Sequence, residues 1–174
     1  MRVLGIDPGL ATTGFAVIEE NASRTGILDG IEVLEAGIIK TPAGEPLQHR
    51  LRTLHDDLVD LIEQYAPDAL SVEELFFNKN VTTAMAVSSA RGVILLACSG
   101  IPQQSYTPLQ IKKQICGYGQ AKKPQIQAMV QRLLNVNFKA MAFHDDAHDA
   151  LAVALCFVMQ QRAGILSLDA LRSA

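Results

Sequence analysis

Near its start the chain reads Arg2-Val3-Leu4-Gly5-Ile6-Asp7-Pro8-Gly9, an apolar run that ends in an acid and a turn. A short apolar run before Pro-Gly predicts a buried strand over residues 2–7. Two more strands are expected over residues 13–19 and 32–39, separated by a polar, Gly-containing turn over residues 21–30. Because short turns join them, these three strands are expected to be antiparallel.

The rest of the chain alternates helical segments with short apolar strands. The expected elements are a helix over residues 46–65, a strand over 68–73, a helix over 81–99, a strand over 102–106, and helices over 108–116, 124–134 and 145–162. Pro46 would begin the first helix where no amide donor is needed. One face of that helix would carry Leu47, Leu51, Leu54, Leu58, Leu61 and Ile62. Strands joined by helical crossovers are parallel, so we expect an α/β fold: a five-stranded mixed sheet flanked by helices on both faces.

Length and composition favour a single domain over residues 1–174. Apolar residues make up 49% of the chain, which argues against disorder. Residues 165–174 are expected to form a C-terminal tail. Its apolar side chains could pack back on the body: Ile165, Leu166, Leu168 and Leu171.

Several features favour a cytoplasmic protein with no membrane partner. The most apolar segment, residues 84–101, is interrupted by Arg91 and two serines, which favours a buried helix over a membrane span. No apolar segment led by basic residues opens the chain, so no secretory signal is expected. Three cysteines lack zinc spacing and are odd in number, which favours buried thiols in a reducing compartment: Cys98, Cys116 and Cys156.

Charge is distributed very unevenly along the chain. Residues 1–74 contain fourteen acids and five Lys or Arg, whereas residues 75–144 contain eight Lys or Arg and no acid. A long basic segment of this kind favours a polyanionic ligand, because basic contacts to phosphates release counterions. A solvated surface with chance clustering is the alternative.

Four acids lie where separate elements end or begin. Asp7 and Glu73 end two apolar strands, and Asp146 and Asp149 open the last helix. Placing such carboxylates together costs Coulomb energy unless a proton or a divalent cation offsets it. Asp146 and Asp149 share a helix face at i,i+3. Gly5 lies on the same strand face as Asp7 and would leave room beside a metal.

Each acid also has a simpler structural interpretation. Asp7, before a Pro-Gly pair, would suit the start of a turn. Asp146 or Asp145 would suit the cap of the last helix, with Asp149 in its first turn. Taken together these interpretations are weaker, because the apolar flanks of Asp7 and Glu73 argue against random surface placement.

The residue types favour a site for Mg²⁺ or Mn²⁺. Carboxylate oxygens are hard ligands that select these ions over zinc or copper. Two such ions about 3.5–4 Å apart can hold a phosphate, activate a water and stabilise a leaving oxygen. We expect two ions per active site, with Asp7 bridging them. Spacing alone does not choose between Glu73 and Glu74, which face opposite ways on a strand.

Four segments of the chain carry a family resemblance. They are Gly5-Ile6-Asp7-Pro8-Gly9 with Thr13-Gly14; Val72-Glu73-Glu74-Leu75-Phe76-Phe77-Asn78-Lys79-Asn80 with Ala90-Arg91-Gly92-Val93; Lys112-Lys113-Gln114 with Gly117-Tyr118-Gly119-Gln120-Ala121-Lys122-Lys123; and Asp146-Ala147-His148-Asp149-Ala150-Leu151-Ala152. In this order, and over nearly the whole chain, they resemble the motifs of the RuvC family of Holliday junction resolvases, the crossover junction endodeoxyribonucleases. The first motif alone is weak, since sugar kinases and actin-like ATPases open similarly. Four in order are a strong signal.

The resemblance implies an RNase H-like fold and a specific activity. The implied protein is a homodimer that cuts four-way (Holliday) DNA junctions by paired, symmetric, metal-dependent phosphodiester hydrolysis, in homologous recombination and DNA repair. The resemblance also implies a bacterial cytoplasmic location, work with the RuvA–RuvB branch-migration complex, and a dimer interface on the helix over residues 81–99. The implied catalytic and metal-binding residues are Asp7, Glu73, Asp146 and Asp149.

The same resemblance selects Glu73 over Glu74. Some relatives carry His where this chain has Asp146, so whether His144 or His148 assists the site stays open. A lone His is more often a surface or helix-end residue than a ligand.

Basic and aromatic residues complete the implied DNA-binding set. Lys112 and Lys123 match the family's two important lysines, and lysines suit backbone phosphates as flexible point charges. Lys123 is the better candidate for a catalytic role that neutralises charge on the cleaved phosphate. An aromatic at Phe76 could stack on a junction base, a contact worth about 1–3 kcal/mol, whereas Phe77 is assigned to the core. The implied DNA-binding residues are Phe76, Lys79, Lys112, Lys113, Lys122 and Lys123.

Two other functions would also account for part of this sequence. An actin-like or sugar-kinase ATPase also uses an early Asp, but it needs a second, similar half that this chain lacks. A DNA-binding dimer without catalysis would bind junctions without needing four carboxylates. The sequence therefore favours a nuclease.

Overall fold

The computed structural model describes residues 1–21, 30–74, 81–138, 144–164, 167–168 and 171, with the backbone alone at residues 81–83. The strands are β1 (Arg2–Asp7), β2 (Thr12–Glu20), β3 (Ile31–Lys40), β4 (Ala69–Glu73) and β5 (Gln103–Tyr106). The helices are α1 (Leu47–Tyr65), α2 (Val81–Ala97), α3 (Pro108–Cys116), α4 (Lys123–Leu134) and α6 (Asp145–Arg162). These ten elements confirm the predicted order of strands and helices, with bounds that differ by at most two residues. Most of the turn predicted over residues 21–30 lies outside the described residues.

The five strands form one mixed sheet in the order β3-β2-β1-β4-β5. β1 pairs antiparallel with β2, and β2 with β3, whereas β4 lies parallel to both β1 and β5. The α/β prediction of a five-stranded mixed sheet is therefore confirmed. Because β1 and β4 are parallel neighbours, their carboxyl ends meet at the same edge of the sheet.

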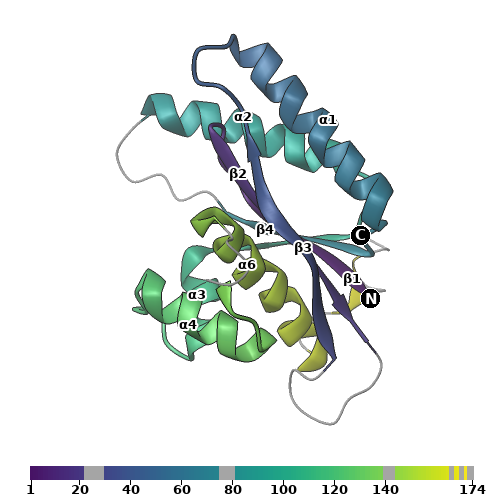
Figure 1. Ribbon diagram of the computed structural model, residues 1–174, viewed down its shortest axis with the longest axis vertical. Coiled ribbons are helices and arrows are strands. Elements are labelled where there is room, and N and C mark those ends of the chain that lie inside the picture. The colour runs from purple at the N-terminus through teal and green to yellow at the C-terminus, as the bar shows by residue number, and fades with distance from the viewer. Residues whose placement is uncertain (22–29, 75–80, 139–143, 165–166, 169–170, 172–174) are drawn as a thin grey trace.

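Helices cover both faces of the sheet, as Figure 1 shows, with α1 and α2 on one side and α3, α4 and α6 on the other. Successive side chains of β1 point to opposite faces of the sheet, so the hydrophobic core consists of two clusters, one on each face. Leu4 and Ile6 pack in a cluster with α1 and α2, whereas Val3 packs in a cluster with α6. No helix within the described ranges is long and apolar enough to cross a membrane.

Local details differ from the sequence predictions in several places. Pro46 is the cap residue of α1 and lies just before its first turn. Leu47, predicted on the buried face of α1, is 44% exposed, because residues 42–49 are all at the surface. Cys116 is only partly buried, whereas the other two thiols are buried as predicted. In the tail, Leu168 and Leu171 pack on the α6 cluster as predicted, while Ile165 and Leu166 lie outside the described residues.

Small residues let α6 approach the sheet closely. A Cβ added at Gly5 would lie 2.3 Å from the carbonyl oxygen of Ala150 and 2.7 Å from the Cβ of Ala154. On β4, the neighbouring Ser71 donates a 2.6 Å hydrogen bond to the carbonyl of Val153. The expectation that Gly5 leaves room beside a metal is therefore wrong, because the backbone of α6 occupies that space.

We expect Gly5→Ala to lower the free energy of unfolding by about 1–3 kcal/mol or more, because the added methyl overlaps backbone that cannot move without shifting α6. Urea unfolding measures the change. Gly44→Ala is the matched control, since no atom lies within 4 Å of a Cβ added there. Equal stability of the two variants would contradict the close approach.

Candidate active site

The carboxyl ends of two parallel strands place the first pair of acids. Asp7 ends β1 and Glu73 ends β4, one step beyond the paired residues Ile6 and Val72. Since Ile6 and Val72 are buried on the α1/α2 side, alternation turns Asp7 and Glu73 to the α6 side. Glu74 is exposed, and its amide donates to the carbonyl of Tyr106 at 2.8 Å. Glu73 is thus the acid that faces the carboxylates of α6.

The first turn of α6 places the second pair. The cap of α6 is His144, whose Nδ1 accepts a hydrogen bond from the amide of Asp146 at 3.4 Å. The interpretation that Asp146 or Asp145 caps this helix is therefore wrong: both lie in its first turn. Gly14 on β2 makes this position possible, because a Cβ there would lie 2.0 Å from the carbonyl oxygen of Asp146.

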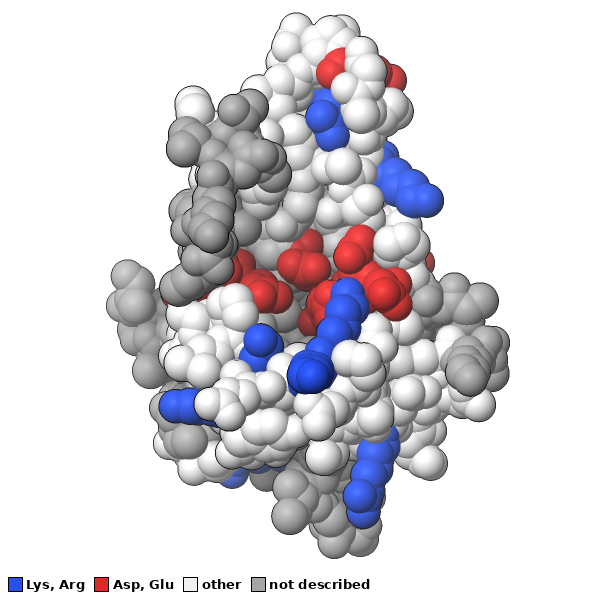
Figure 2. All heavy atoms as spheres, turned by 90° about the vertical axis from the view of Figure 1, so that its left-hand side faces the viewer, with Lys and Arg blue, Asp and Glu red and all other residues white. Residues whose placement is uncertain are grey.

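The acids form a compact group. Oxygens of Asp7, Asp146 and Asp149 all lie within 4.8 Å of one another. Asp7 and Asp149 also line a cavity of about 310 Å³ together with Glu73. Figure 2 shows these surroundings as a hollow of acidic side chains with basic side chains on both sides. The cavity is lined by Asp7, Glu73, Pro108, Ile111, Lys112, Lys123, Ile126, Asp149 and Ala152.

Burial and mutual repulsion make these acids hard to ionise. Burial, then the charges of Asp149 and Asp146, raise the pKa of Asp7 to about 7, against a smaller opposing effect of Lys123. Burial, then the charges of Asp7 and Asp149, raise the pKa of Glu73 to about 8. Burial also raises the pKa of Asp149, although Lys123 partly opposes it. The carboxylates therefore repel one another when ionised, and Lys123 offsets only part of that repulsion.

The donor set fits a hard divalent cation. Mg²⁺ and Ca²⁺ bind oxygens at about 2.0–2.6 Å, so one ion can reach three oxygens that lie within 4.8 Å of one another. All the acids offer oxygen, and no Cys lines the cavity. Asp7, Asp146 and Asp149 are thus able to share one cation, with Glu73 beside them in the cavity.

Lys123 is the cation that the chain itself supplies to this group. Its Nζ lies 2.7 Å from Oδ2 of Asp149 and 3.9 Å from Oδ2 of Asp145. Burial lowers the pKa of Lys123, but the hydrogen bond and charge of Asp149, with the charges of Asp145 and Asp146, outweigh burial and raise it. Lys112 lines the same cavity from α3. Lys113 and Lys122 are exposed and lie outside its lining.

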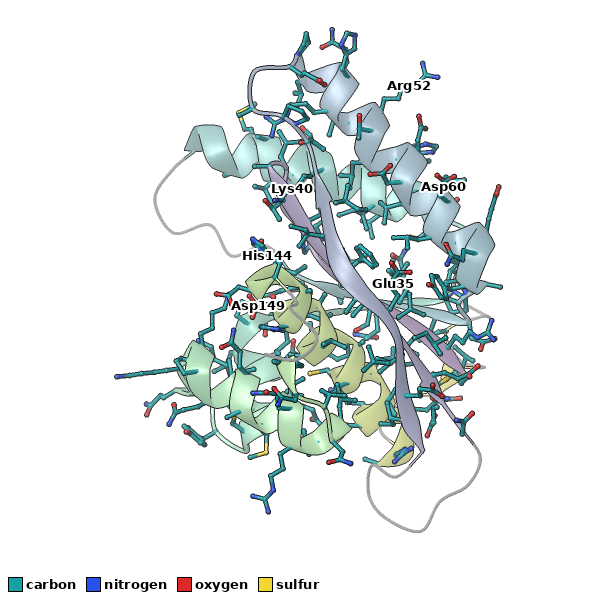
Figure 3. The ribbon with its side chains drawn as sticks, in the orientation of Figure 1. Glu35, Lys40, Arg52, Asp60, His144 and Asp149 are labelled. Atoms are coloured by element: carbon teal, nitrogen blue, oxygen red, sulfur yellow. The ribbon has the colours of Figure 1, made fainter. Side chains whose placement is uncertain are left out.

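The two histidines near the acids have structural contacts. His148 is buried and stacks on Phe138 with ring centroids 3.9 Å apart. Its Nδ1 lies 3.3 Å from the side-chain nitrogen Nε2 of Gln127. His144 caps α6, and its Nδ1 lies 3.3 Å from Oδ2 of Asp146. Figure 3 shows His144 and Asp149 at the same end of α6.

Some expected residues lie outside the described part of the chain, namely Phe76, Phe77 and Lys79. Gly14 and Ser71 are positioning residues to which sequence reasoning gave no role. The sequence does contain a feature that could have identified them: each is a small residue in a strand, on the same sheet face as Asp7. Small residues on one face of a sheet indicate that another backbone approaches closely.

Comparisons with known proteins agree on one family. The family model described as "Crossover junction endodeoxyribonuclease RuvC" matches residues 3–157. A crossover junction endodeoxyribonuclease RuvC of Thermomicrobium roseum is 44% identical over 168 residues, covering 95% of this chain and 98% of the relative. The solved structure of Thermus thermophilus RuvC is similar with a TM-score of 0.82 at 29% identity, over 95% of this chain and 98% of that one. T. thermophilus RuvC in complex with a Holliday junction substrate gives a TM-score of 0.81 at 28% identity, over the same shares.

We expect the metal-free protein to lose stability as the pH rises from about 4 to 8. The raised pKa values of Asp7 and Glu73 mean that the folded state binds more protons than the unfolded chain in this window, so the free energy of unfolding falls with pH. A loss on the order of 1–3 kcal/mol corresponds to roughly 2–10 °C in Tm. Thermal melts in chelator measure it, and Mg²⁺ should raise Tm most at pH 8.

Asp7→Asn is the control for other titrating groups, because it removes one of the two charges at nearly constant shape. Its Tm should exceed that of the unchanged chain at pH 8 and match it near pH 5. Parallel pH profiles for the two proteins would show that the acids do not repel one another as described.

Proposed function

This chain belongs to the RuvC family of crossover junction endodeoxyribonucleases, and from that premise we propose which of its residues cut DNA and how. The enzyme is a nuclease that hydrolyses phosphodiester bonds and resolves Holliday junctions in DNA recombination and repair. One observation supports the proposed site: acids from β1, β4 and α6 share a cavity with two lysines.

Asp7, Glu73, Asp146 and Asp149 would hold two Mg²⁺ or Mn²⁺ ions, with Asp7 between them. The group that joins Asp7 to Asp146 and Asp149 supports one ion, and Glu73, in the same cavity as Asp7, supports the second. A pair of ions held by these residues would supply activation of a water and compensation of the charge on the departing oxygen. The acids fix the positions of that chemistry, because two come from strand ends and two from the start of a packed helix.

The lysines would act on the phosphate itself. Lys123 pairs with Asp149 at 2.7 Å in the metal-free protein. In the catalytic complex, the ammonium group of Lys123 would turn from Asp149 to a phosphate oxygen and neutralise charge that builds there. Lys112, on the wall formed by α3, would hold the same backbone by charge. The expected products are 5′-phosphate and 3′-hydroxyl ends, which ligation can join.

Two copies would act as a homodimer through α2. Met85 and Leu96 are 68% and 67% exposed, which is unusual for such large apolar side chains. Gly92 lies between them in the helix, and among the described residues no atom is within 4 Å of a Cβ added there. A partner helix could approach closely at Gly92 while covering Met85 and Leu96. A two-fold dimer would present two sites to a two-fold junction, which accounts for paired, symmetric cuts.

The remaining partners follow from the family and its substrate. We propose that the enzyme works in the bacterial cytoplasm, where chromosomal junctions form, and that it acts with the RuvA–RuvB branch-migration complex. Phe76, Lys79, Lys113 and Lys122 are proposed as further DNA contacts.

Asp7→Asn, Glu73→Gln and Asp149→Asn should each reduce cutting by about a thousandfold or more while leaving junction binding largely intact, because each loses a charged ligand without a change of fold. The assay compares a labelled four-way junction with a plain duplex, each with Mg²⁺, Mn²⁺ or chelator. Glu74→Gln is the matched control and should cut normally, since Glu74 is exposed and faces away from the cavity. Loss of binding in all three variants, or equal loss of cutting in Glu74→Gln, would contradict the proposed site.

Leu96→Glu should shift the protein from dimer to monomer, because it places a charge at the centre of the proposed apolar contact. Analytical ultracentrifugation measures the mass. Leu109→Glu is a control, since Leu109 is also exposed at 52% but lies on α3. If both variants keep the mass of the unchanged protein, α2 is not the interface.

A further inference from the structure

Lys40 lies beside the active site although it belongs to the acidic part of the chain. It is the last residue of β3 and pairs with Thr12 of β2. Two residues earlier, Ile38 pairs with Gly14, whose backbone is in direct contact with that of Asp146. β3 therefore ends at the same edge of the sheet as β1, on the side of Asp7 away from α3, although none of its residues lines the cavity itself.

Strand alternation places Lys40 on the α6 face of the sheet, the face to which Asp7 and Glu73 also turn. Ile39 is 4% exposed and packs in the cluster with α1 and α2. Its neighbour Lys40 must then point to the opposite face, which is the face of α6. Figure 3 shows Lys40, His144 and Asp149 on the same side of the molecule. The side chain of Lys40 is exposed, so it is available to a ligand in front of the cavity.

Within the described part of the chain, the ammonium group of Lys40 forms no ion pair, unlike several other basic side chains. Arg2 pairs with Glu19, and Arg52 pairs with Asp56. Arg50 donates to the hydroxyl of Thr41 at 3.0 Å. Among the described residues, by contrast, no acid forms an ion pair with Lys40. An exposed ammonium group without a partner, next to a phosphate-cutting site, is suited to a phosphate.

The backbone that carries Lys40 is firmly held. The amide of Thr41 donates to the carbonyl of Ala11 at 3.1 Å, and its hydroxyl donates to the carbonyl of Leu10. Arg50, from the first turns of α1, bonds to that hydroxyl and reaches the carbonyl of Thr41 at 3.4 Å. Lys40 thus projects from a braced strand end, so a phosphate bound by it has a defined position.

The sheet order places Lys40 and Lys112 on opposite sides of Asp7, and of the two only Lys112 lines the cavity. From Asp7 on β1, Lys40 lies two strand spacings away across the sheet and two residues further along, roughly 12 Å between the Cα atoms. Lys112 lies in the other direction, beyond β4 and β5 in the following helix. We propose that Lys40 binds a backbone phosphate of the cleaved strand one or two nucleotides from the cut, on the side opposite Lys112. This assignment rests on the proposed function.

The test is a salt titration of junction binding in chelator, where no cutting occurs. Each phosphate contact contributes about 0.9 to the slope of log affinity against log salt. Lys40→Gln should lower that slope by about this amount, and Lys40→Arg should keep it. Arg52→Gln is the matched control, because Arg52 is exposed on the outer face of α1. Lys112→Gln is the positive control.

Neutral methylphosphonates placed one at a time along the cleaved strand locate the contact. In the unchanged protein, one position near the cut should weaken binding by about threefold to tenfold. In Lys40→Gln the same position should have no effect. If Lys40→Gln keeps the full slope and the full methylphosphonate effect while Lys112→Gln loses its own, the inference is overturned and the proposed function stands. If the unchanged protein does not prefer the junction over a duplex, the proposed function itself fails.

Discussion

Repulsion among half-buried carboxylates is the constraint on which this structure depends. Asp7, Glu73 and Asp149 are pushed together at the ends of strands and the start of a helix, and burial together with their neighbours' charges raises the pKa of each. Electrostatic repulsion alone would favour a structure in which these carboxylates lie far apart. The hydrophobic packing of the two clusters around the sheet holds them in place, and in the proposed site their repulsion would favour binding of a divalent cation.

The packing that resists this repulsion is concentrated where α6 crosses the sheet. Eleven consecutive or nearly consecutive residues of α6 are buried, from Ala147 to Val158. Gly5 and Gly14 remove side chains that would separate the helix from β1 and β2, and Ser71 ties it to β4. The same contacts that bury the helix thus set the position of Asp146 and Asp149 against Asp7. Stability and the geometry of the site are properties of one interface.

The sequence predicted the elements and their order well, because apolar periodicity and Pro-Gly turns are local signals. It also predicted that Asp7 and Glu73 each end an apolar strand, and the parallel pairing of β1 and β4 then brings those two ends together. It was wrong about Gly5, because the space beside a strand depends on a helix that lies 140 residues later in the chain. It was wrong about Leu47 because periodicity does not reveal where α1 extends beyond the core. It did not single out Lys40, whose position depends on sheet order and a distant helix.

Lys123 affects the acids unequally: it pairs directly with Asp149 but has a smaller effect on the pKa values of Asp7 and Glu73. At Asp149 an ammonium group 2.7 Å away already supplies positive charge. At Asp7 and Glu73 the same lysine is a lesser influence, and protons compensate the charge instead, with pKa values of about 7 and 8. In the site proposed above, a divalent cation would compete with protons at Asp7 and Glu73 and with Lys123 at Asp149. In that proposal, cation binding would be coupled to release of Lys123, which would leave its ammonium group available to a phosphate.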